Sequence, residues 1–180
     1  MEGKRGLISI SFIALLCACF FQLQRLQRLK LVKEQVSNYD FTTIPSFEFS
    51  TLKGQSFTNF DLPDDGKAII FMYLDPDCEE CISMIKKINR YYSEFENTHL
   101  YLISETSDDK LEAFSSRFEL VKHPSINLLL DNNQVCYKRF KLISTPSFIV
   151  CDSKQNVVKV IDEEFNFSIV IKYVREAIKS

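Results

Sequence analysis

Two cysteines separated by two residues are the part of this 180-residue chain whose type and spacing could carry chemistry. Cys78 and Cys81 end the segment YLDPDCEEC, in which a short acidic turn follows an apolar run. Thiols at this spacing can close a disulfide across one helical turn. At a helix start, free backbone N–H groups and the positive end of the helix dipole favour a thiolate. We therefore predict that Cys78 and Cys81 form a reversible disulfide.

A buried strand and an amphipathic helix are predicted to position this pair. Residues 68–74, AIIFMYL, form a continuous apolar run of strand length, which is typical of a sheet buried on both faces. Residues 79–95 are predicted to be helical because their apolar side chains recur on one face. Those side chains are Ile82, Ile85, Ile88, Tyr92 and Phe95. A CxxC pair between a strand and a helix favours a redox site.

The remaining thiols and histidines do not have the spacing of a metal site. Zinc would require a second close pair, yet Cys136 and Cys151 lie far apart, and His99 and His123 lack ligand spacing. Cys136 falls in a predicted helix and Cys151 ends an apolar strand. We interpret both as buried free thiols and not as a second redox pair. We expect no bound metal or cofactor.

Length and charge restrict the class of protein. The chain is long enough for one domain of ordinary size plus an appendage. Its formal charge of −2 is uneven, because residues 1–40 are basic and residues 41–180 are acidic. A mildly acidic body argues against nucleic acid as a partner. Six cysteines are too few and too unevenly spaced for a disulfide scaffold.

The N-terminal segment has the composition of a membrane anchor or a signal. Residues 7–21 carry no charge and follow Lys4 and Arg5. We predict an anchor or signal over residues 1–24, with membrane contact through residues 7–23. At ~1.5 Å per residue this apolar run is short of the ~30 Å hydrocarbon core. A lipoprotein acylated at Cys19 is the second interpretation, because LCAC resembles a bacterial lipobox, and a cleaved signal is the third.

The rest of the chain alternates predicted strands with predicted helices. Residues 25–44 are expected to form a helical spacer and linker. The predicted strands after it are 47–50, 56–58, 68–74, 100–103, 126–130, 146–150 and 157–161, and the predicted helices are 79–95, 107–118 and 169–178. Residues 134–142 are expected to hold one or two helical turns. This alternation predicts an α/β domain with a mixed sheet over residues 45–180.

The order of these elements resembles the thioredoxin superfamily. More narrowly, the chain is similar to the membrane-tethered thiol-disulfide oxidoreductases of the TlpA/ResA type. The similarity covers roughly residues 45–178, and its specific parts are the CxxC pair and Thr145-Pro146. Pro45-Ser46-Phe47 also matches the start of such domains. The resemblance implies a thioredoxin-like fold in which helices flank a mixed central sheet.

The resemblance also implies roles for individual residues. Cys78 would be the attacking thiolate and Cys81 the resolving thiol. Pro146 would be a cis proline facing the disulfide, and Thr145 would offer its backbone to an extended substrate segment. The implied function is to reduce, or less readily to oxidise, cysteines of envelope proteins. Its partners would be a disulfide-bearing client protein and a thiol electron donor, and we expect a monomer.

The resemblance and the charge pattern disagree on which side of the membrane the domain lies. Four cations follow the apolar segment: Arg25, Arg28, Lys30 and Lys33. The positive-inside rule would put that side in the cytoplasm. The resemblance places the domain on the extracytoplasmic side, and we take this as the expectation.

The motif departs from thioredoxin at several positions. Asp77 stands where thioredoxins usually have Trp, and Met72 stands where thioredoxin has a buried Asp that assists proton transfer. Asp75 and Glu80 are unranked candidates for accepting the proton of Cys81. Together with Glu79, these carboxylates oppose a thiolate on Cys78. We therefore predict a pair more reducing than thioredoxin, whose potential is about −270 mV.

Two other functions stay open on sequence grounds. A peroxiredoxin-like thiol peroxidase usually has Thr or Ser three residues before its cysteine, where this chain has Asp75. A copper-binding thioredoxin-like module typically has three residues between its cysteines, where this chain has two. Both departures favour the oxidoreductase.

Overall fold

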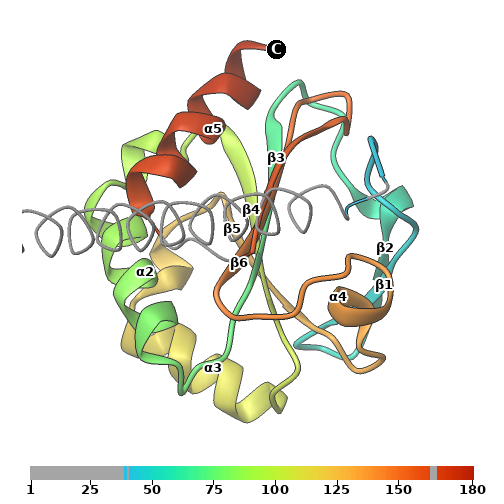
Figure 1. Cartoon of the computed structure of the whole chain (residues 1–180). Helices are drawn as coiled ribbons and strands as arrows, with labels where there is room; N and C mark the ends of the chain where they lie inside the picture. Colours follow the sequence, from blue (N-terminus) through green and yellow to red (C-terminus); the bar gives the residue numbers. More distant parts are fainter. Residues whose placement is uncertain (1–38, 40, 163–165) are drawn as a thin grey trace, which may run out of the picture. The chain divides into compact units, whose positions relative to one another are not determined.

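The computed structural model describes residue 39, residues 41–162 and residues 166–180 of the chain (Figure 1). The chain divides into two units, residues 1–40 and residues 41–180, and the fold below is that of the second. The predicted anchor, the lipobox at Cys19 and the start of the spacer lie outside the described residues. Within the described residues, no helix has the length and apolar character needed to span a bilayer.

A seven-stranded sheet forms the centre of the domain, in the order β2-β1-β5-β4-β3-β6-β7. The strands are β1 (Glu48–Thr51), β2 (Ser56–Thr58), β3 (Ala68–Tyr73), β4 (Thr98–Ser104), β5 (Ile126–Leu130), β6 (Ser147–Cys151) and β7 (Val157–Ile161). Strands β3, β4 and β5 run parallel, and each of the other pairings is antiparallel. The predicted mixed sheet is therefore confirmed.

Strand β3 lies in the middle of this sheet and carries the chain to the CxxC motif. It pairs with β4 on one side and β6 on the other, so Tyr73 lies opposite both Ile103 and Ser147. Successive side chains of a strand point to opposite faces. Ile70 and Phe71 are both fully buried, so both faces of β3 are covered. This burial explains the continuous apolar run in the sequence.

Helices cover both faces of the sheet. Figure 1 shows α2 (Glu79–Arg90), α3 (Asp108–Arg117) and α5 (Phe167–Lys179) on one side and the short α4 (Val135–Lys138) on the other. The core under the three long helices consists of apolar side chains from β3, β4, β6 and the helices themselves. Short 3₁₀ turns at Asn59–Asp61, Tyr92–Glu94 and Leu120–Lys122 complete the elements.

One predicted helix is shorter than the periodicity indicated. The helix predicted to reach Phe95 ends at Arg90, and the 3₁₀ turn Tyr92–Glu94 follows. This tighter turn still brings Phe95 into the core, where it is fully buried. Apolar spacing alone does not distinguish the two geometries over one turn. The helical turn expected within residues 134–142 is confirmed as α4, which ends at Lys138, before Lys141 adopts a left-handed conformation with φ of 57°.

Aromatic side chains fill the face under α4. The ring centroids of Phe47 and Phe71 are 5.5 Å apart, and those of Phe71 and Phe140 are 5.7 Å apart. Phe49 completes the group, with its ring 5.0 Å from that of Phe47. Such pairs add to the stabilisation from area burial. The cluster holds the β1–β2 hairpin and the α4 segment onto β3.

Candidate functional site

The loop between β3 and α2 is folded by its first aspartate. The Asp75 Oδ1 atom accepts a hydrogen bond from Asp77 N at 2.9 Å, and the Asp75 carbonyl accepts one from Cys78 N at 3.1 Å. Aspartate commonly closes turns in this way. Pro76, whose φ is restricted, is buried within the turn. The loop therefore places Cys78 at the position just before the first turn of α2.

Cys78 is the N-cap residue of α2. Its backbone is extended, with φ of −75° and ψ of 123°, and its Sγ atom accepts a hydrogen bond from Cys81 N at 3.3 Å. A sulfur at this position receives a backbone donor that the helix itself leaves unpaired. The same donor and the helix dipole stabilise negative charge on the sulfur. The predicted position of Cys78 at the helix start is confirmed.

A backbone carbonyl and a carboxylate also lie at the Cys78 sulfur. Sγ is 3.5 Å from the Thr145 carbonyl oxygen and 3.6 Å from Glu80 Oε2. The thiol can donate to either oxygen. The Thr145-Pro146 peptide bond is cis, as the resemblance implies. Residues 67 positions apart in the sequence thus meet at the reacting sulfur.

Cys81 lies on the inner side of the same helical turn. It is completely buried, whereas Cys78 is half-buried. Burial, followed by its interaction with Cys78, raises the pKa of the Cys81 thiol to about 12 from its ordinary value of 9.0. The Asp75 backbone and the Thr145 side chain oppose this rise. Cys81 is therefore a protonated thiol until Cys78 has reacted.

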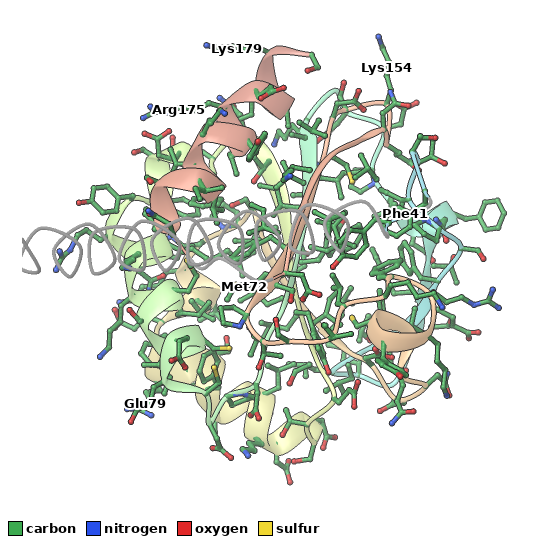
Figure 2. All side chains as sticks on the ribbon, in the orientation of Figure 1. Phe41, Met72, Glu79, Lys154, Arg175 and Lys179 are labelled. Carbon is green, nitrogen blue, oxygen red and sulfur yellow. The ribbon has the colours of Figure 1, made fainter. Side chains whose placement is uncertain are left out.

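The carboxylates predicted to modulate the pair occupy different positions. Glu80 lies near the Cys78 sulfur, whereas Figure 2 shows Glu79 at the outer edge of the molecule. Asp77 forms an ion pair with Lys110 of α3. Asp75 is exposed, and its carboxylate is engaged by the turn. Of these groups, Glu80 is the one with a direct contact to the reacting sulfur.

Met72 is fully buried in β3, inside the molecule (Figure 2). A thioether cannot accept the proton of Cys81 as a carboxylate does. The candidates for that role are therefore the exposed Asp75 and Glu80, as the sequence indicated.

An open cavity of about 430 Å³ lies beside the motif, at the C-terminal ends of β3 and β4. Among the residues lining it are Tyr73, Asp75, Glu105, Lys110, Ser144 and Thr145. The Tyr73 hydroxyl donates a hydrogen bond to Glu105 Oε1 at 2.9 Å. Burial and this carboxylate raise the pKa of Tyr73, which keeps the phenol a neutral donor. The cavity extends from Thr145 to the turn that precedes Cys78.

Cys136 and Cys151 are buried free thiols, as predicted. Burial is the main cause that raises the pKa of each. Across the described residues, no group of three or more histidine, cysteine or acidic side chains is arranged to hold a metal ion.

Three residues at the site have no signal in the sequence. Lys110 pairs with Asp77, Glu105 accepts from Tyr73, and Asp162 accepts from the loop that carries Thr145. Each acts through a partner from a different element. Local periodicity and motif spacing contain no information on such contacts.

Comparison with known protein families identifies one that matches most of the domain. The profile described as AhpC/TSA family matches residues 42–160, which include the motif, the cis proline and every strand except the last residue of β7. The chain belongs to the AhpC/TSA family. No curated protein sequence matches this AhpC/TSA chain.

Solved structures confirm the thioredoxin-like fold of this AhpC/TSA family member. A thioredoxin-like protein from Porphyromonas gingivalis is 19% identical, with a TM-score of 0.61 over 77% of this chain and 94% of its own. A secreted Mycobacterium tuberculosis disulfide oxidoreductase homologous to E. coli DsbE is 16% identical, with a TM-score of 0.59 over 72% and 95%. A thiol:disulfide interchange protein from Chlorobium tepidum is also 16% identical, with a TM-score of 0.58 over 79% and 99%.

Proposed function

We propose that this chain is a thiol-disulfide oxidoreductase that reduces disulfides of other proteins through Cys78 and Cys81. The observation that carries the proposal is the geometry at one sulfur. Cys78 Sγ is half-buried at a helix start, 3.3 Å from Cys81 N and 3.5 Å from the carbonyl before a cis proline. The proposed attacking thiol, the buried resolving thiol and the half-buried backbone of Thr145 thus meet at one position.

The reaction proceeds in two exchanges. The Cys78 thiolate attacks one sulfur of the client disulfide, a Cys78–client disulfide forms, and the second client sulfur leaves as a thiolate that takes up a proton. Cys81 then loses its proton and attacks Cys78 Sγ, which releases the first client sulfur. The client gains two electrons and two protons, and the chain is left with a Cys78–Cys81 disulfide. An external thiol donor restores the dithiol.

The buried thiol controls the second exchange. With a pKa of about 12, Cys81 is a weak nucleophile at neutral pH. A hydrogen bond and a charge interaction with Cys78 contribute to the raised pKa of Cys81. Once Cys78 is bonded to a client, its sulfur carries no charge, and these two contributions become smaller. Water or the exposed Asp75 and Glu80 carboxylates receive the proton. We therefore infer that Cys81 becomes able to attack once the Cys78–client disulfide has formed.

The family match also supports a second function, a peroxiredoxin-like thiol peroxidase. There, Cys78 would attack a hydroperoxide to give a sulfenic acid and an alcohol, and Cys81 would displace water to form the disulfide. Such a site needs donors for the leaving oxygen. Besides the Cys81 N–H, the groups in hydrogen-bond contact with Cys78 Sγ among the described residues are the Thr145 carbonyl and the Glu80 carboxylate, and both are acceptors. This geometry favours disulfide exchange.

One trapping experiment tests the proposed function. The Cys81→Ser variant should accumulate a mixed disulfide with client proteins in cells, because the second exchange is blocked, whereas Cys78→Ser should accumulate none. Peroxide consumption by the purified chain faster than disulfide reduction would favour the peroxidase. Tight Cu(I) binding without turnover would instead favour the copper-binding module.

We also propose that residues 7–23 tether the domain on the extracytoplasmic side of a membrane. The support is the apolar segment in the sequence and the resemblance to membrane-tethered oxidoreductases. A periplasmic-type reporter fused after Ser180 should be active, and a cytoplasmic reporter should be inactive. The opposite result would show that the basic flank determines the orientation.

A further inference from the structure

Asp162 follows β7 and bonds to the loop that carries the cis proline. It is 6% exposed. Its Oδ2 atom accepts from Ile143 N at 3.2 Å, and its Oδ1 atom accepts from Ser144 N at 3.3 Å and Ser144 Oγ at 3.1 Å. The Ser147 hydroxyl also donates to Oδ1, and the Ser144 hydroxyl lies at the Asp162 carbonyl. One buried carboxylate thus receives donors from both sides of the loop.

The donors bracket the residue that touches the reacting sulfur. Ser144 and Ser147 lie on either side of Thr145 and Pro146, and the Thr145 carbonyl is 3.5 Å from Cys78 Sγ. Asp162 therefore fixes the flanks of this segment while the peptide itself faces the thiol. Ser147 also pairs with Tyr73 in the register of β6 with β3, which ties the same segment to the strand leading to the motif.

We propose that Asp162 is a positioning residue for client binding. By holding residues 143–147, it presents the Thr145 backbone to an extended client segment at a fixed distance from Cys78. This inference rests on the proposed oxidoreductase function and deepens it. Asp162 acts through the loop and takes no part in the electron transfer.

The chemistry of the contact explains why a carboxylate stands at this position. A buried carboxylate is costly unless several donors satisfy it, and Asp162 has donors from backbone and hydroxyl groups. The backbone N–H groups of Ile143 and Ser144 point at separate oxygens of the carboxylate. An amide offers one acceptor oxygen and places an NH₂ group at the other position. Asp162→Asn should therefore remove either the acceptor of Ile143 N or the shared acceptor of Ser144 and Ser147, without changing side-chain size.

The turn at the other end of the β6–β7 hairpin supplies a matched control. Asp152 is 8% exposed and accepts from Lys154 N at 2.9 Å, Asn156 N at 2.8 Å and Asn156 Nδ2 at 2.8 Å. It closes the turn between the two strands, away from the cis proline loop. Asp152→Asn therefore reports the cost of altering a buried carboxylate in the same hairpin.

The test compares two substrates for the full chain and its variants. One is a peptide with an intramolecular disulfide, which must lie along Thr145, and the other is hydroxyethyl disulfide, which has no peptide backbone. We expect Asp162→Asn to raise the KM for the peptide more than it lowers kcat. The ratio of peptide kcat/KM to the hydroxyethyl disulfide rate should fall about tenfold. Asp152→Asn should leave this ratio unchanged, whatever it does to the melting temperature.

The outcomes separate the inference from the proposed function. An equal loss on both substrates in Asp162→Asn, or an equal change of the ratio in Asp152→Asn, would show a merely structural role and overturn the inference. If Asp162→Asn does not fold, Ser144→Ala removes one donor and should lower the ratio in the same direction. A wild-type chain that reduces neither substrate would overturn the proposed function, and the inference with it.

Discussion

The two thiols of the motif differ because one helical turn has an outer and an inner side. Cys78 at the N-cap is half-buried and receives the Cys81 N–H, whereas Cys81 points into the core and is completely buried. Burial disfavours the thiolate, so the pKa of Cys81 rises while Cys78 keeps donors and solvent access. This difference supports the proposed roles, in which Cys78 attacks and Cys81 resolves.

Alkylation of the reduced native chain should report this difference directly. We expect iodoacetamide at pH 8 to modify Cys78 at least about tenfold faster than Cys81, because the thiolate is the reactive species. Cys136 and Cys151 should stay unmodified because both are buried with a raised pKa. Mass spectrometry of the digested protein measures each site, and labelling in urea gives the fully reactive control. Equal labelling of Cys78 and Cys81 would contradict the assignment.

The raised pKa of Cys81 also makes stability depend on pH. In the unfolded chain this thiol ionises near its ordinary value of 9.0, whereas in the folded chain it stays protonated up to about 12. The unfolded state therefore loses a proton that the folded state keeps, and stability falls as the pH rises above 9. The stability of the wild type relative to Cys81→Ala should decrease by about 1.4 kcal/mol between pH 8 and pH 10. Urea unfolding under reducing conditions measures the difference.

Removal of the Glu80 charge should raise the reduction potential of the pair. Glu80 Oε2 is 3.6 Å from Cys78 Sγ, and an exposed carboxylate at this range opposes a thiolate by roughly 1 kcal/mol. Glu80→Gln keeps an acceptor for the thiol and should shift the potential upward by about 20 mV. Glu79→Gln is the control and should shift it less, since Glu79 is exposed at the outer edge of the molecule (Figure 2). Equilibration with glutathione measures the reduction potential of each variant. A lower potential in Glu80→Gln than in the wild type would refute the charge argument.

The sequence predicted which residues of the candidate site come together better than it predicted their surroundings. CxxC spacing and the Thr-Pro pair were sufficient to select Cys78, Cys81 and Thr145-Pro146, which meet in the structure. The ranking of Glu80 over Glu79 was not predictable, because adjacent helical residues differ by the direction of their side chains. That direction depends on which face of α2 is buried against the sheet.

Most helices and strands could be predicted from local sequence patterns, but the residues at which they end could not. The apolar run at β3 and the periodic face of α2 were read correctly because burial on one or two faces fixes the spacing of apolar residues. The end of α2 at Arg90 and the short α4 depend on where the chain must turn toward the next strand. Strand β6 begins at Ser147, after a proline that has no N–H to donate to the sheet.

A single carboxylate begins α4, and its loss should destabilise the domain. Asp131 is 2% exposed, and its two oxygens accept from Val135 N at 2.7 Å and Cys136 N at 2.8 Å. Asp131→Ala leaves two buried N–H groups unpaired, which should cost about 2–4 kcal/mol. Asp61→Ala is the matched control, since Asp61 also accepts two hydrogen bonds, from Thr58, but at the surface. Urea unfolding should show a smaller loss there, and equal losses would contradict the argument from burial.

At the scale of the whole molecule, the site depends on contacts that no local pattern contains. Asp162 reaches Ser144 across 18 residues, and Lys110 reaches Asp77 across 33. The antiparallel pairing of β6 with β7 makes the first contact. The parallel pairing of β3 with β4 makes the second, because it brings the start of α3 beside the loop that follows β3. The resemblance predicted the mixed sheet and a Pro146 that faces the two cysteines. The side chains that support the site, Asp162 and Lys110, were found only in the structure.

The charge around the motif predicts which clients react fastest. The loop before α2, the first turn of α2 and the residues leading into α3 carry Asp75, Asp77, Glu79, Glu80, Glu105, Asp108 and Asp109. Lys110 is the cation paired within this group. Because residues 41–180 are also acidic overall, an approaching client meets a negative field at the thiol.

A peptide disulfide flanked by lysines should therefore be reduced faster than one flanked by glutamates, by about tenfold at low ionic strength. Salt screens charges beyond ~3 Å at 1 M, so the ratio should approach one as NaCl is raised. Lys110→Gln should enlarge the ratio at low salt, because it removes the cation, whereas Lys179→Gln at the end of α5 should not. Stopped-flow rates at several salt concentrations make the measurement, with a glutamine-flanked peptide as the neutral reference. A rate ratio that does not change with salt would show that the client is selected by the shape of the loop at Thr145 and not by the field around Cys78.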